Sequence, residues 1–215
     1  MRRLPPEFFE LKPSMPRPDS PLDTPLMGLA NPYFPAPAAR RADILVYVDF
    51  DGVLQHHAVY WHPKRGVYMH PQEAEGRALF EWAHYLESAL LEFPDVRLVL
   101  SSSWCVRPGY GKALRRLTEG LGAKFIGGTF HRRIHGVDPW TLASFKATPR
   151  ALQIWNDVQR RKPVHWLALD DDVTDWPPAH SKNLVACDGT TGVSSPGVQA
   201  ELREKLSAFG PGPYC

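Results

Sequence analysis

Residues 44–55 read ILVYVDFDGVLQ, in which five apolar residues lead directly into Asp49, Phe50, Asp51 and Gly52. An uninterrupted apolar run predicts a strand that is covered on both faces, as in a parallel sheet. Because side chains two residues apart share one side of a strand, Asp49 and Asp51 are expected to lie close together. Two such carboxylates repel each other unless something positive lies between them. The end of this strand therefore leaves three alternatives: a metal ion, a basic side chain or water.

The pattern around this stretch alternates strands with helices. Such alternation predicts a doubly wound α/β fold, a three-layer sandwich around a parallel sheet of about five strands. The segment 59–70, with a Pro-Lys-Arg-Gly turn between two aromatic runs, predicts a small β-hairpin flap. Spacings of three and four apolar residues predict a long helix over 71–93. Further strands are expected at 96–101, 123–128, 164–170 and 183–188, and further helices at 111–122, 148–162 and 194–209.

Composition divides the chain into two parts. Residues 1–41 contain about ten of the 22 prolines and are predicted to form a largely disordered arm, followed by one catalytic domain over 42–215. The net charge of +2 does not by itself indicate nucleic acid or a membrane surface. Three scattered cysteines form no zinc or disulfide pattern and favour the cytoplasm. No apolar run approaches the length of a membrane span.

Three of the expected strands end in polar residues that would face one crevice. These ends are Asp49 and Asp51, the serines 101–103, and the aspartates 170–172. An aspartate after a single strand is usually a turn former. Together, however, carboxylates suit Mg²⁺ and hydroxyls suit the oxygens of a phosphate, which predicts phosphoryl-transfer chemistry. Histidines 56, 57, 62 and 70 match no closed zinc site.

The motifs VYVDFDGVL, LSSSW and WLALDDD resemble those of the haloacid dehalogenase-like (HAD) superfamily, over roughly residues 42–209. Within it, they look most like the small HAD domains associated with Swiss army knife RNA-repair proteins. The resemblance implies that Asp49 is the nucleophile and a Mg²⁺ ligand. It implies that Asp51 is the general acid/base and that its backbone carbonyl is a further metal ligand. Gly52 matches the glycine that lets the chain turn beside the substrate.

The resemblance also assigns the later motifs. Ser101 matches the hydroxyl that binds the phosphoryl group, with Ser102 as the alternative if the strand is one residue longer. Asp170 matches the metal ligand of the last motif and Asp171 its partner, while Asp172 and Asp175 are spare acids. The expected basic residue is Lys146, and the alternatives are Arg150 and Lys124.

Two features bear on the substrate. Chloride leaves without a proton, so the second acid Asp51 favours a phosphatase or phosphotransferase over a dehalogenase. No insertion has the size of a cap domain, so the site is expected to be open and to suit a large phosphorylated substrate. Nucleic acid remains an alternative, with Lys64, Arg65 and the segment 131–136 as a basic rim and aromatics 60, 61, 68 and 140 for stacking. A non-catalytic interaction protein is the third hypothesis.

Overall fold

The computed structural model describes residues 40–210. The arm predicted for residues 1–41 thus lies, apart from its last two residues, outside the described part of the chain. The sheet has five parallel strands in the order β5-β4-β1-β6-β7. Their bounds are β1 Ile44–Val48, β4 Arg97–Leu100, β5 Phe125–Gly128, β6 His165–Asp170 and β7 Leu184–Ala186. The predicted doubly wound parallel sheet is therefore confirmed.

Strand β1 is the middle of this sheet. Val48 lies opposite Leu100 of β4 on one side and Leu169 of β6 on the other. All five residues of β1 are buried, because helices cover both faces. The strand order reverses at β1, with β4 and β6 on opposite sides, and such switch points are where doubly wound sheets bind ligands.

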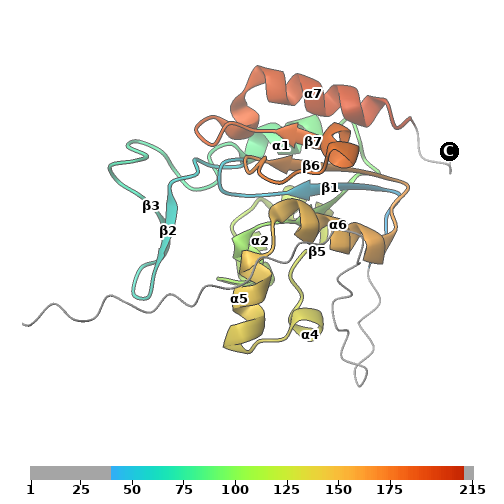
Figure 1. Cartoon of the computed structure of the whole chain (residues 1–215). Coiled ribbons are helices and arrows are strands. Elements are labelled where there is room, and N and C mark those ends of the chain that lie inside the picture. Colours follow the sequence, from blue (N-terminus) through green and yellow to red (C-terminus); the bar gives the residue numbers. More distant parts are fainter. Residues whose placement is uncertain (1–39, 211–215) are drawn as a thin grey trace, which may run out of the picture.

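Two apolar layers hold the helices on the sheet. On one face, residues of α1 (Ala83–Ala89), α2 (Tyr110–Leu114), α3 (Glu119–Lys124) and α7 (Pro196–Ser207) pack against Val46, Leu98 and Leu167. On the other face, Ile154 and Val158 of α6 (Arg150–Arg161) pack against the opposite side of the same strands. Figure 1 shows α7 along the top of the molecule and α6 at the front of the sheet.

The segment 71–93 is not the single long helix that its apolar spacing predicts. Only Ala83–Ala89 is α-helical, and positive φ angles at Gly76 (74°) and Phe80 (61°) break the turn before it. The Phe80 N–H donates to Gln55 Oε1 at 2.9 Å and the Trp82 N–H donates to the Leu54 carbonyl at 3.0 Å. Contacts with the segment after β1 thus replace helical hydrogen bonds.

The predicted hairpin is present as β2 (Val59–His62) and β3 (Gly66–Met69), and in Figure 1 it projects from the left side of the body. Two helices that the sequence did not indicate, α4 (Arg132–His135) and α5 (Pro139–Ala147), lie between β5 and α6. Neither insertion has the size of a cap domain, as predicted. Among the described helices, none has the length and apolar character of a membrane span.

Candidate active site

The carboxyl ends of four neighbouring strands meet in one polar site. Asp49 follows β1, Ser101 follows β4, Thr129 follows β5 and Asp170 ends β6. The strands are parallel, so these ends share one edge of the sheet. All four side chains are buried. The topology alone therefore brings together residues that are up to 121 positions apart in the sequence.

Asp49 is held between backbone and an arginine. Its Oδ1 accepts a hydrogen bond from the Phe50 N–H at 2.5 Å, and its Oδ2 accepts one from Arg150 Nη2 at 3.0 Å. Arg150 is the first residue of α6, and its Nε also lies 3.4 Å from Asp170 Oδ2. One guanidinium therefore bridges the two carboxylates, which reduces their mutual repulsion. The sequence left open whether a metal ion, a basic side chain or water lies between the carboxylates at the end of β1. The structure shows a basic side chain, that of Arg150, beside Asp49.

Asp51 has separate partners. Its Oδ1 accepts a hydrogen bond from Gln55 Nε2 at 2.6 Å, and Trp104 Nε1 lies 3.0 Å from both carboxylate oxygens. Burial and the nearby Asp49 carboxylate raise the pKa of Asp51 to about 7, although these hydrogen bonds act in the opposite direction. A carboxyl group with this pKa is partly protonated at neutral pH. It can therefore donate a proton to a leaving group and accept one from water.

Three carboxylates form a cluster that fits a divalent cation. Oxygens of Asp49, Asp170 and Asp171 lie within 4.8 Å of one another, and the Asp51 side chain is outside this group. Asp170 Oδ2 is buried and accepts no hydrogen bond within the described part of the chain. Burial and the Asp49 carboxylate raise the pKa of Asp170, and the same two causes raise that of Asp171 to about 6. An all-oxygen set of this kind suits Mg²⁺.

Further polar atoms of the site also lack partners. The hydroxyls of Ser101 and Thr129 are buried without a hydrogen bond to any described residue, and Arg150 Nε has only its ion pair with Asp170. Buried polar groups are normally satisfied, because an unmade hydrogen bond costs about 1–3 kcal/mol. Two donor-capable hydroxyls and a guanidinium beside a carboxylate cluster are suited to the free oxygens of a phosphoryl group.

Gly52 occupies the place that the sequence indicated. Its φ is +75°, a conformation that favours glycine, and a Cβ at this position would lie 2.1 Å from Asp171 Oδ2. A side chain here would therefore displace a carboxylate of the cluster. The absence of a side chain at Gly52 thus leaves room for the Asp171 carboxylate in the cluster.

The structure places the three candidates for the basic residue differently. Lys146 is exposed in the last turn of α5, and the structure shows no ion pair from it to the carboxylates; Arg150 occupies the position expected for the basic residue. Lys124 lies at the end of α3, near the Pro94 carbonyl. Arg150 rather than Lys146 faces the carboxylates because α5 ends at Ala147, before the chain reaches the strand ends. Helix α6 begins beside the strand ends, directly after Pro149.

The remaining expected residues are also placed. Ser102 is buried but caps the short 3₁₀ helix Ser103–Cys105, so Ser101 is the better placed hydroxyl. The Asp172 N–H donates to Asp170 Oδ1 at 3.1 Å, whereas Asp175 is exposed with a φ of 56°. Sequence reasoning missed Gln55, Trp104 and Thr129. Gln55 ends the stretch 44–55 and Trp104 ends the motif LSSSW, yet side-chain contacts across the site were needed to identify them.

Together, the sheet and the strand-end carboxylates define a HAD-like α/β domain. Comparison with known families agrees: residues 45–198 match the family described as the HAD domain in Swiss Army Knife RNA repair proteins. The match covers more than half of the chain, and the protein belongs to this family of HAD-type hydrolase domains. No curated protein and no solved structure gave a significant match.

Proposed function

We propose that the protein is a Mg²⁺-dependent phosphatase that hydrolyses phosphoric monoesters through an aspartyl-phosphate on Asp49. The observation that carries this proposal is that Asp49 belongs to a carboxylate cluster and contacts the Arg150 guanidinium, with an unpartnered Ser101 hydroxyl at the next strand end. The family supports hydrolase chemistry. The separate acid Asp51 favours an ester whose leaving group needs a proton, which distinguishes a phosphatase from a dehalogenase.

The reaction divides into two transfers that share the same residues. A carboxylate oxygen of Asp49 attacks phosphorus, the bond from phosphorus to the ester oxygen breaks, and the leaving alkoxide takes the proton of Asp51. Water then attacks phosphorus and loses a proton to Asp51 while the bond to Asp49 breaks. The products are an alcohol and inorganic phosphate. Gln55 and Trp104 orient Asp51 through both steps.

Asp49, Asp170 and Asp171 would hold Mg²⁺, with the Asp51 carbonyl as the expected further ligand. The bound ion would supply positive charge that stabilises the transferring phosphoryl group. Arg150 contributes permanent positive charge and planar donors to the phosphoryl oxygens. Ser101 and Thr129 offer their hydroxyls to the same oxygens. Each residue thus stabilises charge that develops during transfer.

The surroundings of the site support a large substrate. The insertions between β1 and β4 and between β4 and α6 are too small to form a cap domain that would enclose a small molecule. We propose an open site that accepts a phosphate on a macromolecule. The proposed compartment is the cytoplasm, consistent with the buried free thiols Cys105 and Cys187.

A phosphatase screen with a matched variant tests the mechanism. The wild-type protein should release phosphate from a generic aryl phosphate in the presence of Mg²⁺, and Asp49→Asn should lower kcat by at least about 10³-fold. Asp175→Asn, at an exposed acid outside the cluster, is the control and should keep activity within about twofold. Full activity of Asp49→Asn would exclude this nucleophile. Absence of both turnover and Mg²⁺ binding by calorimetry would instead favour the non-catalytic hypothesis.

A further inference from the structure

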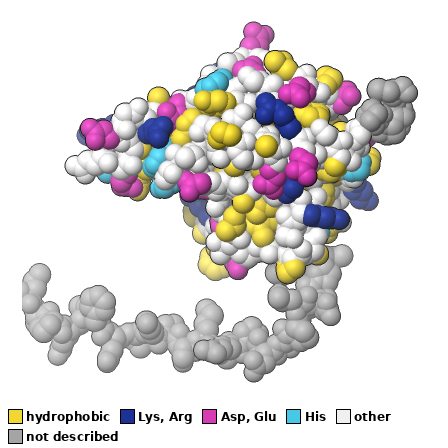
Figure 2. All heavy atoms as spheres, turned by 90° about the horizontal axis from the view of Figure 1, so that it is seen from above, with side chains coloured by type: hydrophobic (Ala, Val, Ile, Leu, Met, Phe, Trp, Pro, Cys, Tyr) yellow, Lys and Arg dark blue, Asp and Glu magenta, His cyan; other side chains and the backbone are white. Residues whose placement is uncertain are grey.

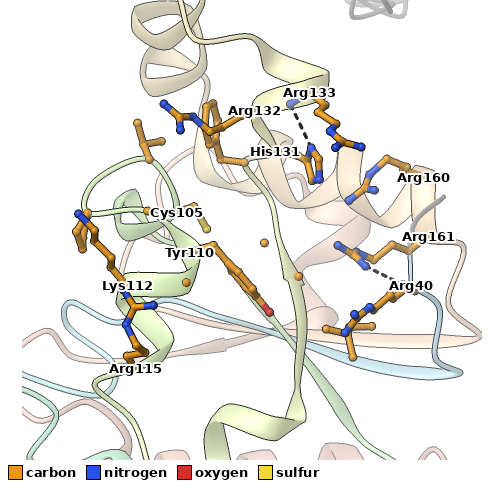
Figure 3. A pocket seen from close by; sticks show the side chains of 18 residues that line it. Arg40, Cys105, Tyr110, Lys112, Arg115, His131, Arg132, Arg133, Arg160 and Arg161 are labelled. Atoms are coloured by element: carbon orange, nitrogen blue, oxygen red, sulfur yellow. Dashed lines mark hydrogen bonds between the residues drawn. The ribbon is translucent and has the colours of Figure 1, made fainter. Parts of the chain in front are cut away.

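A cavity lies outside the carboxylate cluster, along the free edge of the sheet. Its volume is about 720 Å³, within the range of ligand-binding pockets. Residues 126–128 of the edge strand β5 form its floor, and the segment 105–112 and the end of α6 form opposite walls. Residues 130–133, from the turn after β5 and the start of α4, close one end (Figure 3).

This cavity is strongly basic although the chain as a whole carries a net charge of only +2. Its described lining contains no Asp or Glu. Two of its arginines, Arg160 and Arg161, pair with the buried carboxylate of Asp157. Five more cations have no carboxylate partner among the described residues: Arg40, Lys112, Arg115, Arg132 and Arg133. Figure 2, by contrast, shows positive and negative side chains interspersed on the face covered by α7.

The positions of these cations indicate a ligand with several anionic groups. In Figure 3, Lys112 and Arg115 lie on one side of Tyr110, while Arg160 and Arg161 lie on the other. Arg132 and Arg133 come from a third element, α4. The three groups come from different sides of the cavity, an arrangement that suits successive phosphates of a phosphodiester chain. Guanidinium groups are well suited to phosphate oxygens.

The floor of the cavity offers apolar and aromatic surface that can contact the bases of such a chain. The half-buried ring of Tyr110 crosses it, with its hydroxyl bonded to the Phe125 carbonyl at 3.1 Å. Ile126 and the edge of the otherwise buried Phe130 add apolar lining. Sites that bind single-stranded nucleic acid combine positive charge along the backbone with aromatic surface for the bases. At Gly127, a Cβ would lie 2.4 Å from Arg161 Nη2, so glycine lets this guanidinium lie against the floor.

The same structural elements connect this cavity with the carboxylates. Arg150 at the start of α6 contacts Asp49, while Arg160 and Arg161 at its end line the cavity. Ten residues of helix span about 15 Å, the length of about four stacked nucleotides. Cys105, in the cavity wall, follows Ser101 by four residues. A strand of about that length spans the distance along α6 from the cavity to the helix end that contacts Asp49.

We propose that this cavity binds the phosphodiester backbone of a single-stranded nucleic acid whose terminal phosphate is the substrate at Asp49. The catalytic part of this inference rests on the proposed phosphatase function, whereas the binding part does not. Arg132 and Arg133 belong to the basic segment predicted from the sequence. Lys64 and Arg65 of the hairpin, which were predicted to share that basic rim, do not line the cavity.

The test compares two variants that lose the same charge. In the cavity variant, Lys112, Arg115, Arg132 and Arg133, all exposed, are each replaced by Gln. In the control variant, the exposed Lys64, Arg65, Lys162 and Lys182 are replaced in the same way. Circular dichroism and thermal unfolding would show that both variants are folded. The ligands are oligonucleotides of about twelve nucleotides, RNA and DNA, without a terminal phosphate.

Fluorescence anisotropy at low salt should show that the wild-type protein binds the oligonucleotides. The affinity should be at least tenfold lower in the cavity variant and should stay within about twofold of the wild-type value in the control variant. The slope of log K against log salt should fall by about two to three, since each lost phosphate contact contributes about 0.7. Equal loss in both variants, or unchanged binding in the cavity variant, would overturn the proposal. So would equally tight binding of a phosphopeptide with the same charge or of phosphoinositide vesicles.

A second readout separates this proposal from the catalytic one. Turnover of 3′- and 5′-phosphorylated oligonucleotides is compared with turnover of an aryl phosphate, and the ratio of their kcat/KM values should fall at least tenfold in the cavity variant. Oligonucleotide binding without any turnover would refute the phosphatase while supporting the cavity. Aryl phosphate turnover without oligonucleotide binding would refute the cavity alone.

Discussion

At the scale of single residues, mutation can distinguish whether Arg150 or Lys146 is the basic group that acts beside Asp49. Arg150 contacts both Asp49 and Asp170, whereas Lys146 is exposed on α5. Removal of a group that stabilises developing charge typically lowers kcat by about 10²–10³. We expect Arg150→Ala to lower kcat/KM for an aryl phosphate by about 10²-fold and Lys146→Ala to change it by less than about threefold. Steady-state kinetics measure both.

The conservative change at the same position sharpens this prediction. Arg150→Lys keeps the charge but loses the planar fork that contacts two carboxylates. Its activity should lie between those of the wild-type protein and Arg150→Ala. Thermal unfolding of each variant separates a catalytic loss from a folding defect. If Lys146→Ala lost most of its kcat/KM while Arg150→Ala stayed active, the basic residue of the site would be Lys146.

The site residues differ in how far the sequence could predict them. Asp49, Asp51 and Asp170 follow buried apolar strands, and their convergence is dictated by a parallel sheet. Arg150 and Lys146 are separated by one short turn, so only the place where α5 ends and α6 begins decides which one faces the strand ends. Thr129 follows a short strand and has no recognisable motif. Only the fold shows that it lies next to the end of β4, where Ser101 follows.

At the scale of elements, α6 is fixed to β1 by a buried polar network. Asp157 of α6 accepts hydrogen bonds from the Tyr47 hydroxyl at 3.1 Å and from Arg161 Nε at 2.5 Å. Burial, followed by the Asp157 charge, raises the pKa of Tyr47, so its hydroxyl stays protonated and donates. The same helix carries Arg150 at its other end. The network therefore holds the helix that places Arg150 beside Asp49.

Loss of the Asp157 charge should destabilise the protein strongly. Removal of one partner of a buried ion pair typically costs about 3–5 kcal/mol, because the other charge remains buried. We expect Asp157→Asn to lower the free energy of unfolding by about 3 kcal/mol, measured by urea denaturation. Tyr47→Phe, which removes one neutral donor, should cost about 1 kcal/mol.

Glu201→Gln is the matched control, because it removes the carboxylate of a partly exposed i,i+4 pair with Lys205 on α7. Such pairs contribute about 0.3–0.5 kcal/mol. If Asp157→Asn and Glu201→Gln had equally small effects, the buried network would not be what fixes α6.

The segment 71–93 shows where element prediction from sequence is limited. Its apolar residues do recur at helical spacing, and Trp82, Leu86 and Leu90 are buried as that spacing predicts. However, spacing does not report hydrogen-bond partners. The Gln55 side chain and the Leu54 carbonyl bond to this segment and favour turns before Ala83. The buried face was predictable, whereas the length of the helix depended on contacts with a distant loop.

At the scale of the whole molecule, charge is separated between two regions. The strand order places acidic side chains at the centre of the carboxyl edge, while basic side chains line the cavity beside β5. Alternating strands and helices were enough to predict the sheet and its acidic end. The basic cavity was not predictable as a unit, because its cations come from four separate segments that only the folded chain brings together. Negative charge thus gathers at the carboxyl edge of the sheet and positive charge in the cavity, while the net charge of the protein stays small.

The acidic end should make the metal-free protein less stable as pH rises. Burial raises the pKa of Asp51 to about 7 and that of Asp171 to about 6, and it also raises that of Asp170. The folded state then binds more protons than the unfolded state above pH ~4, where unfolded aspartates titrate. Stability gained from these groups at low pH is therefore lost between about pH 4 and pH 7. Thermal unfolding across this range in EDTA measures the loss.

Mg²⁺ should reverse this loss, because it binds the ionised carboxylates of the folded state. At a concentration of about 100 times Kd, a ligand of the folded state adds about 2.7 kcal/mol, which corresponds to a rise in Tm of roughly 5–10 °C for a domain of this size. The rise should be larger at pH 7 than at pH 5, since protons compete with the metal. Asp170→Asn should abolish it, whereas Asp175→Asn should retain it. An equal rise in Asp170→Asn would place the ion elsewhere on the molecule.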